Sequence, residues 1–126
     1  MKNIIERKNA PLPIGPYSQA VMVKDVLYVS GQVAIIPSTG ELETRDITRE
    51  THQVMKNIEA ILHEAGMEFS DVVKSTIFVK DLNNFATINS VYGEYYPYSP
   101  PARETVEVSR LPKDVNVEIS CIAVKE

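Results

Sequence analysis

One amphipathic segment constrains the fold of this chain more than any other feature of its sequence. From residue 47 to residue 65, apolar or small side chains recur every three or four positions, which is the spacing of one helix face. Asp46 stands where a helix N-cap is expected, and Gly66 stands where a left-handed residue ends many helices. The predicted stripe consists of Ile47, Thr51, Val54, Met55, Ile58, Ile61, Leu62 and Ala65.

Short runs rich in β-branched residues predict strands on both sides of this helix. Lys24 and Asp25 separate the first two runs and favour a hairpin, and the turn residues 37–40 close the third. The expected strands cover residues 21–23, 26–30, 33–36, 72–80, 103–108 and 115–124.

A second, shorter helix is predicted between the fourth and fifth strands. It runs from about residue 83 to residue 96, where Phe85, Ile88 and Tyr92 share one face, and Pro97 ends it. The resulting order is β-β-β-α-β-α-β-β. This order predicts an α+β fold in which two helices cover one face of a mainly antiparallel sheet.

Composition limits the classes of function that are open to the chain. Its 126 residues predict a single domain over 1–126, and its net charge of −4 argues against general nucleic-acid binding. No apolar run is long enough to cross a bilayer and no signal peptide is recognisable, so we expect a cytoplasmic protein. Cys121 with His52 and His63 is too small a set for a classical zinc site, so no metal is expected.

The second face of the predicted sheet is neither plainly core nor plainly surface. In the last strand, one alternating set is apolar throughout and should face the helices. The other set begins with Asn116, Glu118 and Ser120 and then turns apolar at Ile122 and Val124. A subunit interface that holds a pocket would have this mixed character, and so would a solvated face.

Asn89 is a second irregularity, because it falls on the apolar stripe of the second helix. A buried amide has to be hydrogen-bonded, or it costs roughly 1–3 kcal/mol. A structural hydrogen bond to nearby backbone is the usual explanation, and presentation of a polar group to a ligand is the alternative.

Several segments, in matching order and spacing along nearly the whole chain, resemble the RidA/YjgF/UK114 family of reactive-intermediate deaminases. The resemblance is carried by Ile14-Gly15-Pro16-Tyr17-Ser18-Gln19-Ala20, Ser30-Gly31-Gln32, Phe78-Val79-Lys80-Asp81-Leu82, Pro101-Ala102-Arg103, 106–114 and Val117-Glu118-Ile119.

The resemblance implies a chorismate-mutase-like protomer. Three such protomers would form a homotrimer around a central barrel, with a pocket at each subunit interface. The implied activity is hydrolysis of 2-aminoacrylate-type enamines, through their 2-imino acid tautomers, to 2-keto acids and ammonia. The expected ligand is therefore a small imino or keto acid, and no cofactor is expected.

The resemblance also assigns residues, and their chemistry suits the reaction. Arg103 would clamp the substrate carboxylate, since its planar fork donates two parallel hydrogen bonds. Glu118, expected on the neighbouring strand, would orient and deprotonate a water for attack at the C=N carbon. Tyr17 joins them as a catalytic candidate. The remaining expected substrate-binding residues are Ser30, Gly31, Phe85, Asn89 and Thr105.

Each of these residues taken singly has a plainer interpretation. Arg103 and Glu118 could form a cross-strand ion pair, Tyr17 could pack in a turn, and Ser30-Gly31 could be a β-bulge. Two positions depart from the family pattern. Thr105 occupies a place where relatives often have cysteine, which argues against thiol chemistry, and Glu104 stands where small or apolar residues are usual.

Two other classes of function compete with the deaminase. A small-carboxylate binding protein could use Arg103 without turnover, although it would gain little from a second carboxylate at Glu118. An RNA-acting translation inhibitor is the weakest alternative, because the sequence has an acidic balance and no basic stripe.

Overall fold

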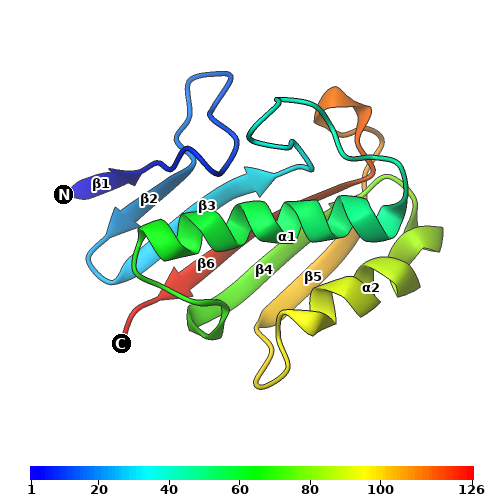
Figure 1. The fold of residues 1–126 in the computed structure, drawn as a ribbon. Helices are drawn as coiled ribbons and strands as arrows, with labels where there is room; N and C mark the ends of the chain where they lie inside the picture. The colour runs from blue at the N-terminus through cyan, green and yellow to red at the C-terminus, as the bar shows by residue number, and fades with distance from the viewer.

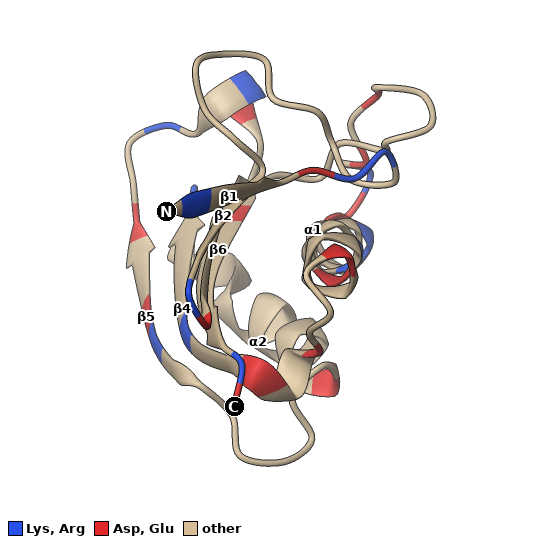
Figure 2. Cartoon of the chain, turned by 90° about the vertical axis from the view of Figure 1, so that its left-hand side faces the viewer, with Lys and Arg blue, Asp and Glu red and all other residues tan.

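The computed structural model describes all residues from 1 to 126 and shows one six-stranded sheet with two helices on the same face (Figure 1). Viewed along the sheet, both helices lie to one side and the other face has no covering element (Figure 2). No helix is long and apolar enough to cross a membrane. The elements are β1 (Lys2–Ile5), β2 (Ala20–Val23), β3 (Val26–Gln32), α1 (Ile47–Glu64), β4 (Val72–Val79), α2 (Phe85–Glu94), β5 (Ala102–Glu107) and β6 (Val117–Val124), with short 3-10 turns at η1 (Phe69–Asp71), η2 (Leu82–Asn84) and η3 (Pro112–Asp114).

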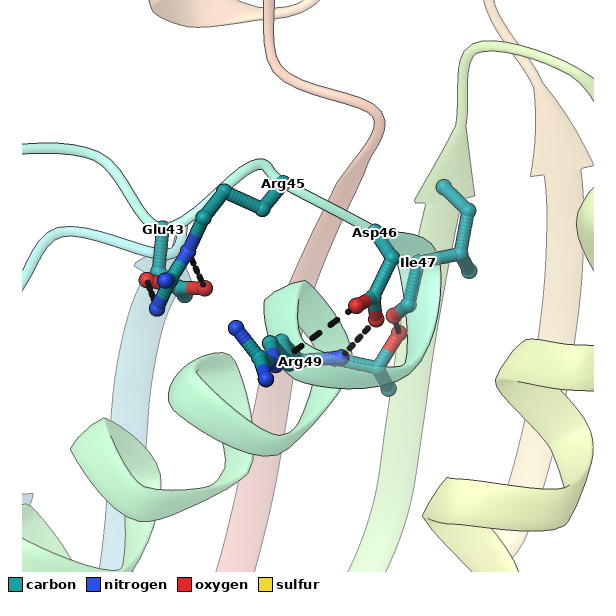
Figure 3. A network of polar contacts seen from close by, with 6 residues as sticks. Glu43, Arg45, Asp46, Ile47 and Arg49 are labelled. Carbon is teal, nitrogen blue, oxygen red and sulfur yellow. Dashed lines mark hydrogen bonds and ion pairs between the residues drawn. The ribbon is translucent and has the colours of Figure 1, made fainter.

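Helix α1 confirms the first sequence prediction and its caps. The Asp46 side chain accepts a hydrogen bond from the Arg49 backbone N–H at 2.8 Å, as the N-cap assignment requires (Figure 3). Gly66 follows the helix with φ +72°, which is the left-handed conformation expected there. The helix buries its apolar stripe, including Val54, Met55 and Ile58, against the sheet.

The strand order is β1-β2-β3-β6-β4-β5. All neighbouring strands pair antiparallel except β4 and β5, which run parallel, so the sheet is mainly antiparallel as predicted. Strand β4 therefore lies between β5 and β6. The expectation that Arg103 and Glu118 occupy neighbouring strands is wrong, because β5 and β6 follow each other in sequence but do not pair.

The core lies between the sheet and the two helices. In β6, alternate residues from Val117 to Ala123 are buried, which confirms the apolar set assigned to the helix side. The opposite set is half-buried along its whole length. Nearby on that open face, Ile4, Tyr28 and Val106 are exposed apolar side chains. The mixed character of the second face is therefore confirmed.

Three elements differ from the sequence prediction: one predicted strand is absent, one strand was not predicted, and the second helix is shorter. Residues 33–36 do not join the sheet, since Ile35 forms an isolated antiparallel bridge with Leu42. Asn57 of α1 also donates to the carbonyl oxygens of Val33 at 3.1 Å and Ile35 at 3.0 Å. The predicted element order nevertheless holds, since the edge strand β1 at residues 2–5 was not predicted and takes the missing place. Helix α2 is shorter than expected, because residues 82–84 form a 3-10 turn and the helix stops at Glu94.

Candidate functional site

Arg103 forms a small polar cluster with helix α2. Its Nη1 atom donates to Asn89 Oδ1 at 2.6 Å, and its guanidinium carbon lies 5.1 Å from the centre of the Tyr92 ring and 5.6 Å from that of Phe85. These contacts hold the arginine by one amide and two aromatic faces. Arg103 belongs to none of the chain's ion pairs, so its charge is not neutralised by a carboxylate.

A cavity of about 480 Å³ opens in front of this arginine. Asn89 and Arg103 supply its polar groups, while Tyr92, Pro100 and Pro101 supply apolar surface. A guanidinium without an acidic partner at the edge of an open cavity is suited to binding a carboxylate. The prediction of a buried Asn89 is wrong, because its side chain is exposed at this cavity and its hydrogen bond goes to Arg103, not to backbone.

Glu118 and Gly31 form a second cluster on the open face of the sheet. A Cβ atom added to Gly31 would lie 2.8 Å from both Cδ and Oε2 of Glu118, so the carboxylate occupies the space that a side chain at residue 31 would need. Burial raises the pKa of the Glu118 carboxyl above its ordinary value, and no neighbouring charge opposes this effect. Such a carboxylate is a stronger base than an exposed glutamate.

Ser30 and Tyr17 lie beside this second cluster. The strand register shifts between Val29 and Gln32, so Ser30-Gly31 is indeed part of a β-bulge. Ser30 Oγ donates to the Ser18 carbonyl oxygen at 2.6 Å, which ties the bulge to the N-terminal loop. Tyr17 on that loop is half exposed, and its hydroxyl makes only a long 3.5 Å contact with the Ile14 N–H. The phenol is therefore free to meet a ligand.

Gln19 positions this loop, a role that was not predicted from the sequence. Its buried amide donates to the carbonyl oxygens of Arg7, Ala10 and Pro11 at 3.1, 3.2 and 2.8 Å, and it accepts from the Arg7 N–H at 2.7 Å. The signal was a glutamine next to a small apolar residue, Ala20, at the start of a strand, where a buried polar side chain has to satisfy backbone groups.

The two clusters lie on opposite faces of the sheet within one chain. Parallel pairing places Arg103 opposite Ser75, whose side chain points toward α2 and accepts a hydrogen bond from the Tyr92 hydroxyl. Glu118 pairs with Phe78, whose side chain is on the other face. The prediction that Arg103 lies on the mixed face is therefore wrong, and the two residues form no cross-strand ion pair.

The two departures from the family pattern have different surroundings. Thr105 Oγ1 is buried on the helix side without a hydrogen-bond partner in the protomer. Glu104 points to the open face, where it pairs with Lys74 at 3.2 Å and accepts from Thr76 at 3.0 Å. Glu104 therefore forms an ordinary surface ion pair with Lys74, between β5 and β4. Burial also raises the pKa of Cys121 to about 12, which keeps this thiol protonated.

Two helices on one face of a six-stranded, mainly antiparallel sheet are the architecture of a chorismate-mutase-like α+β fold. Residues 7–125 match the family model described as Endoribonuclease L-PSP. The chain therefore belongs to this family, which is the RidA/YjgF family.

Named relatives agree with this assignment. A RutC family protein of Pyrococcus horikoshii is 54% identical over 126 residues, and the match covers 100% of each chain. The chloroplastic Reactive Intermediate Deaminase A of Arabidopsis thaliana is 40% identical over 122 residues, which are 97% of this chain and 65% of that protein. The crystal structure of E. coli TdcF with bound serine has a TM-score of 0.94 at 42% identity, covering 98% of this chain and 99% of that one.

Proposed function

We propose that this protein hydrolyses reactive 2-imino acids, of the 2-iminopropanoate and 2-iminobutanoate type, to 2-keto acids and ammonia. The observation that carries the proposal is the unneutralised Arg103 at an open cavity of about 480 Å³, in a chain that also holds a half-buried carboxylate at Glu118. The proposal also draws on a 40% identical relative that is named a Reactive Intermediate Deaminase.

Arg103 binds the carboxylate of the imino acid. Asn89 and the rings of Phe85 and Tyr92 hold the guanidinium, so few side-chain conformations are lost when the substrate binds. TdcF, a relative of similar structure, has been crystallised with serine, which also has a carboxylate next to a nitrogen-bearing carbon.

Glu118 acts as the base for the water. It takes a proton from the water as the oxygen attacks the C=N carbon and passes this proton to the imine nitrogen, which becomes an amine on a carbon that now carries a hydroxyl. Glu118 then moves the remaining hydroxyl proton to that nitrogen, the C–N bond breaks, and ammonia leaves as the C=O bond forms. Tyr17, Ser30 and the Gly31 backbone line the place of reaction, and Thr105 contributes to the carboxylate side.

Assembly brings the two clusters together. Because they lie on opposite faces of one sheet, a single protomer cannot present both to one small molecule. Arg103 lies on the edge strand β5, so in a homotrimer in which this edge meets the open sheet face of the next protomer, Arg103 of one protomer meets Glu118 of the next, and each interface holds one pocket. The half-polar face with exposed Tyr28 and Val106 supports such an assembly.

A direct assay tests the activity. A serine/threonine dehydratase generates the imine in situ, and keto-acid and ammonia release are followed with wild type, Arg103→Ala and Glu118→Gln. We expect wild type to accelerate release. Arg103→Ala should lose roughly 10- to 100-fold in kcat/KM, because a charge-assisted carboxylate contact contributes about 1.5–3 kcal/mol. The absence of acceleration by wild type would overturn the proposal.

The same assay distinguishes the deaminase from a second candidate, which is a carboxylate receptor without turnover. The completeness of the Arg103 cluster within one protomer favours it, since binding alone does not need Glu118. A receptor would bind 2-ketobutyrate through Arg103 in a titration while leaving the imine's spontaneous hydrolysis unchanged.

A further inference from the structure

A second cavity lies at one end of the sheet, where three loops meet. The N-terminal loop, the segment between β3 and α1, and the η3 turn come together there (Figure 1). They enclose about 450 Å³, a volume typical of sites for small organic molecules. Neither Arg103 nor Glu118 lines this cavity.

The walls of this end cavity are mainly apolar. Pro11, Leu12 and Ile14 come from the N-terminal loop, and Ile35 and Pro37 come from the segment between β3 and α1. Leu12 is 56% exposed and Ile14 is 73% exposed, although both are large aliphatic residues. Apolar side chains that gather around an open cavity are typical of ligand-binding surfaces.

Two lysines supply the charge at the end cavity. Lys8 and Lys113 line it together with no acidic residue. Neither lysine belongs to an ion pair, whereas Lys74 and Lys80 on the nearby sheet are both paired with carboxylates. The cavity therefore offers two free ammonium groups beside an apolar surface, in a chain whose net charge is −4.

The backbone around Lys113 is held in an unusual conformation. Lys113 and Asp114 both have φ of 56°, and left-handed non-glycine residues cost of order 1 kcal/mol each. Asp114 accepts a hydrogen bond from Lys80 Nζ at 3.0 Å, so its carboxylate is engaged away from Lys113. Strained residues of this kind concentrate at functional sites such as ligand clamps.

We propose that the end cavity binds a small organic anion, with its apolar body between Leu12 and Ile35 and its carboxylate or phosphate head on Lys8 and Lys113. Two cations favour a doubly charged phosphate ester over a singly charged carboxylate. This site adjoins the region of the proposed imine chemistry but includes neither Arg103 nor Glu118. A small space lined by Tyr17 and Gly31 shares four residues with it: Pro11, Leu12, Ile14 and Ile35.

Calorimetric titration of the full chain tests the site with four probes: phenyl phosphate, phenylacetate, inorganic phosphate and benzyl alcohol. We expect saturable binding of the two aromatic anions, with phenyl phosphate the tighter. Inorganic phosphate lacks the apolar body and benzyl alcohol lacks the charge, so both should bind at least ten-fold more weakly. Equal binding of phenyl phosphate and inorganic phosphate would contradict the apolar part of the proposal.

Substitutions test whether Lys8, Lys113 and Leu12 form the binding site. Lys8→Gln/Lys113→Gln should weaken phenyl phosphate roughly ten-fold or more, and Leu12→Asn should weaken it while keeping the charge. Lys56→Gln, which removes an exposed lysine on α1, is the matched control. All substituted positions except Leu12 are solvent-exposed lysines, so thermal unfolding should not change in the lysine variants. No saturable binding, or equal binding by wild type and the double lysine variant, would overturn the site whatever the result of the imine assay.

Discussion

The Glu118 side chain lies against the backbone of Gly31 on the open face of the sheet, and this contact explains why residue 31 has no side chain. The sequence pattern predicted that Glu118 points away from the helices, since it alternates with buried Val117 and Ile119. It could not predict the neighbours of Arg103. Those depend on the parallel register with β4, which places Arg103 opposite Ser75, and local alternation carries no information about register.

Gly31→Ala should impair activity more than stability. The added methyl would overlap the end of the Glu118 side chain, which is flexible and can move aside, so we expect the unfolding free energy to change by less than about 1 kcal/mol. The displaced carboxylate should reduce kcat for imine hydrolysis at least ten-fold. Thr44→Ala, at an exposed loop residue outside both clusters and the Arg103 cavity, is the control. Equal activity of Gly31→Ala and wild type would remove Glu118 from the mechanism.

Glu118 should also make stability depend on pH. Burial raises its pKa in the folded state, so the folded protein binds this proton more tightly than the unfolded chain does. The stabilising effect is complete below the unfolded pKa of about 4.3 and is lost as pH rises through the higher folded pKa. Glu118→Gln should therefore have a higher Tm than wild type at pH 7 and no such advantage near pH 4. A Tm difference independent of pH would contradict this assignment.

Among the elements, α1 could be predicted because its stripe and caps are local signals. The strand predicted at residues 33–36 is absent from the sheet for a non-local reason. Residues 33–36 have the apolar composition of a strand, but Asn57, more than twenty positions later, takes the carbonyl oxygens of Val33 and Ile35. Strand β1 was missed because a short, exposed edge strand with only Ile4 and Ile5 as apolar residues gives no periodic signal.

Asp46→Ala should destabilise the chain by about 1 kcal/mol, because the Arg49 N–H loses its side-chain acceptor at the start of α1 (Figure 3). The accompanying ion pair to Arg49, at 3.6 Å on the surface, should add little. Urea unfolding measures the change, and Glu41→Ala, at an exposed carboxylate without side-chain contacts in this network, is the control. Equal effects of the two substitutions would contradict the capping role.

At the scale of the whole molecule, the open sheet face is the feature that one protomer leaves unexplained. Its half-polar pattern was visible in the sequence of β6, and the structure extends it across the neighbouring strands to Tyr28, Phe78 and Val106. The sequence could not show that Arg103 is turned away from this face. That separation within one protomer is the strongest physical reason to propose a pocket shared between protomers.

Tyr28→Glu should break the proposed trimer. Tyr28 is 49% exposed on the open face, opposite Ile122, so a single chain tolerates a carboxylate there while a packed interface does not. Light scattering should give wild type about three times the 14.1 kDa of one chain and the variant a single chain's mass. Tyr98→Glu, at a loop residue that is 86% exposed, should leave the mass unchanged. If wild type were a monomer, the proposal of a pocket shared between protomers would be wrong.

Complementation between two inactive variants tests the shared pocket most directly. Arg103→Ala and Glu118→Gln are each assayed alone and then after joint unfolding and refolding at equal amounts, which forms mixed trimers. If Arg103 and Glu118 of different protomers form each pocket, one interface in each mixed trimer carries both intact residues, which is roughly one quarter of all interfaces in a random equal mixture. We therefore expect recovery of up to about one quarter of wild-type activity. Activity no higher than that of the separate variants, in mixtures shown by mass to contain mixed trimers, would contradict it.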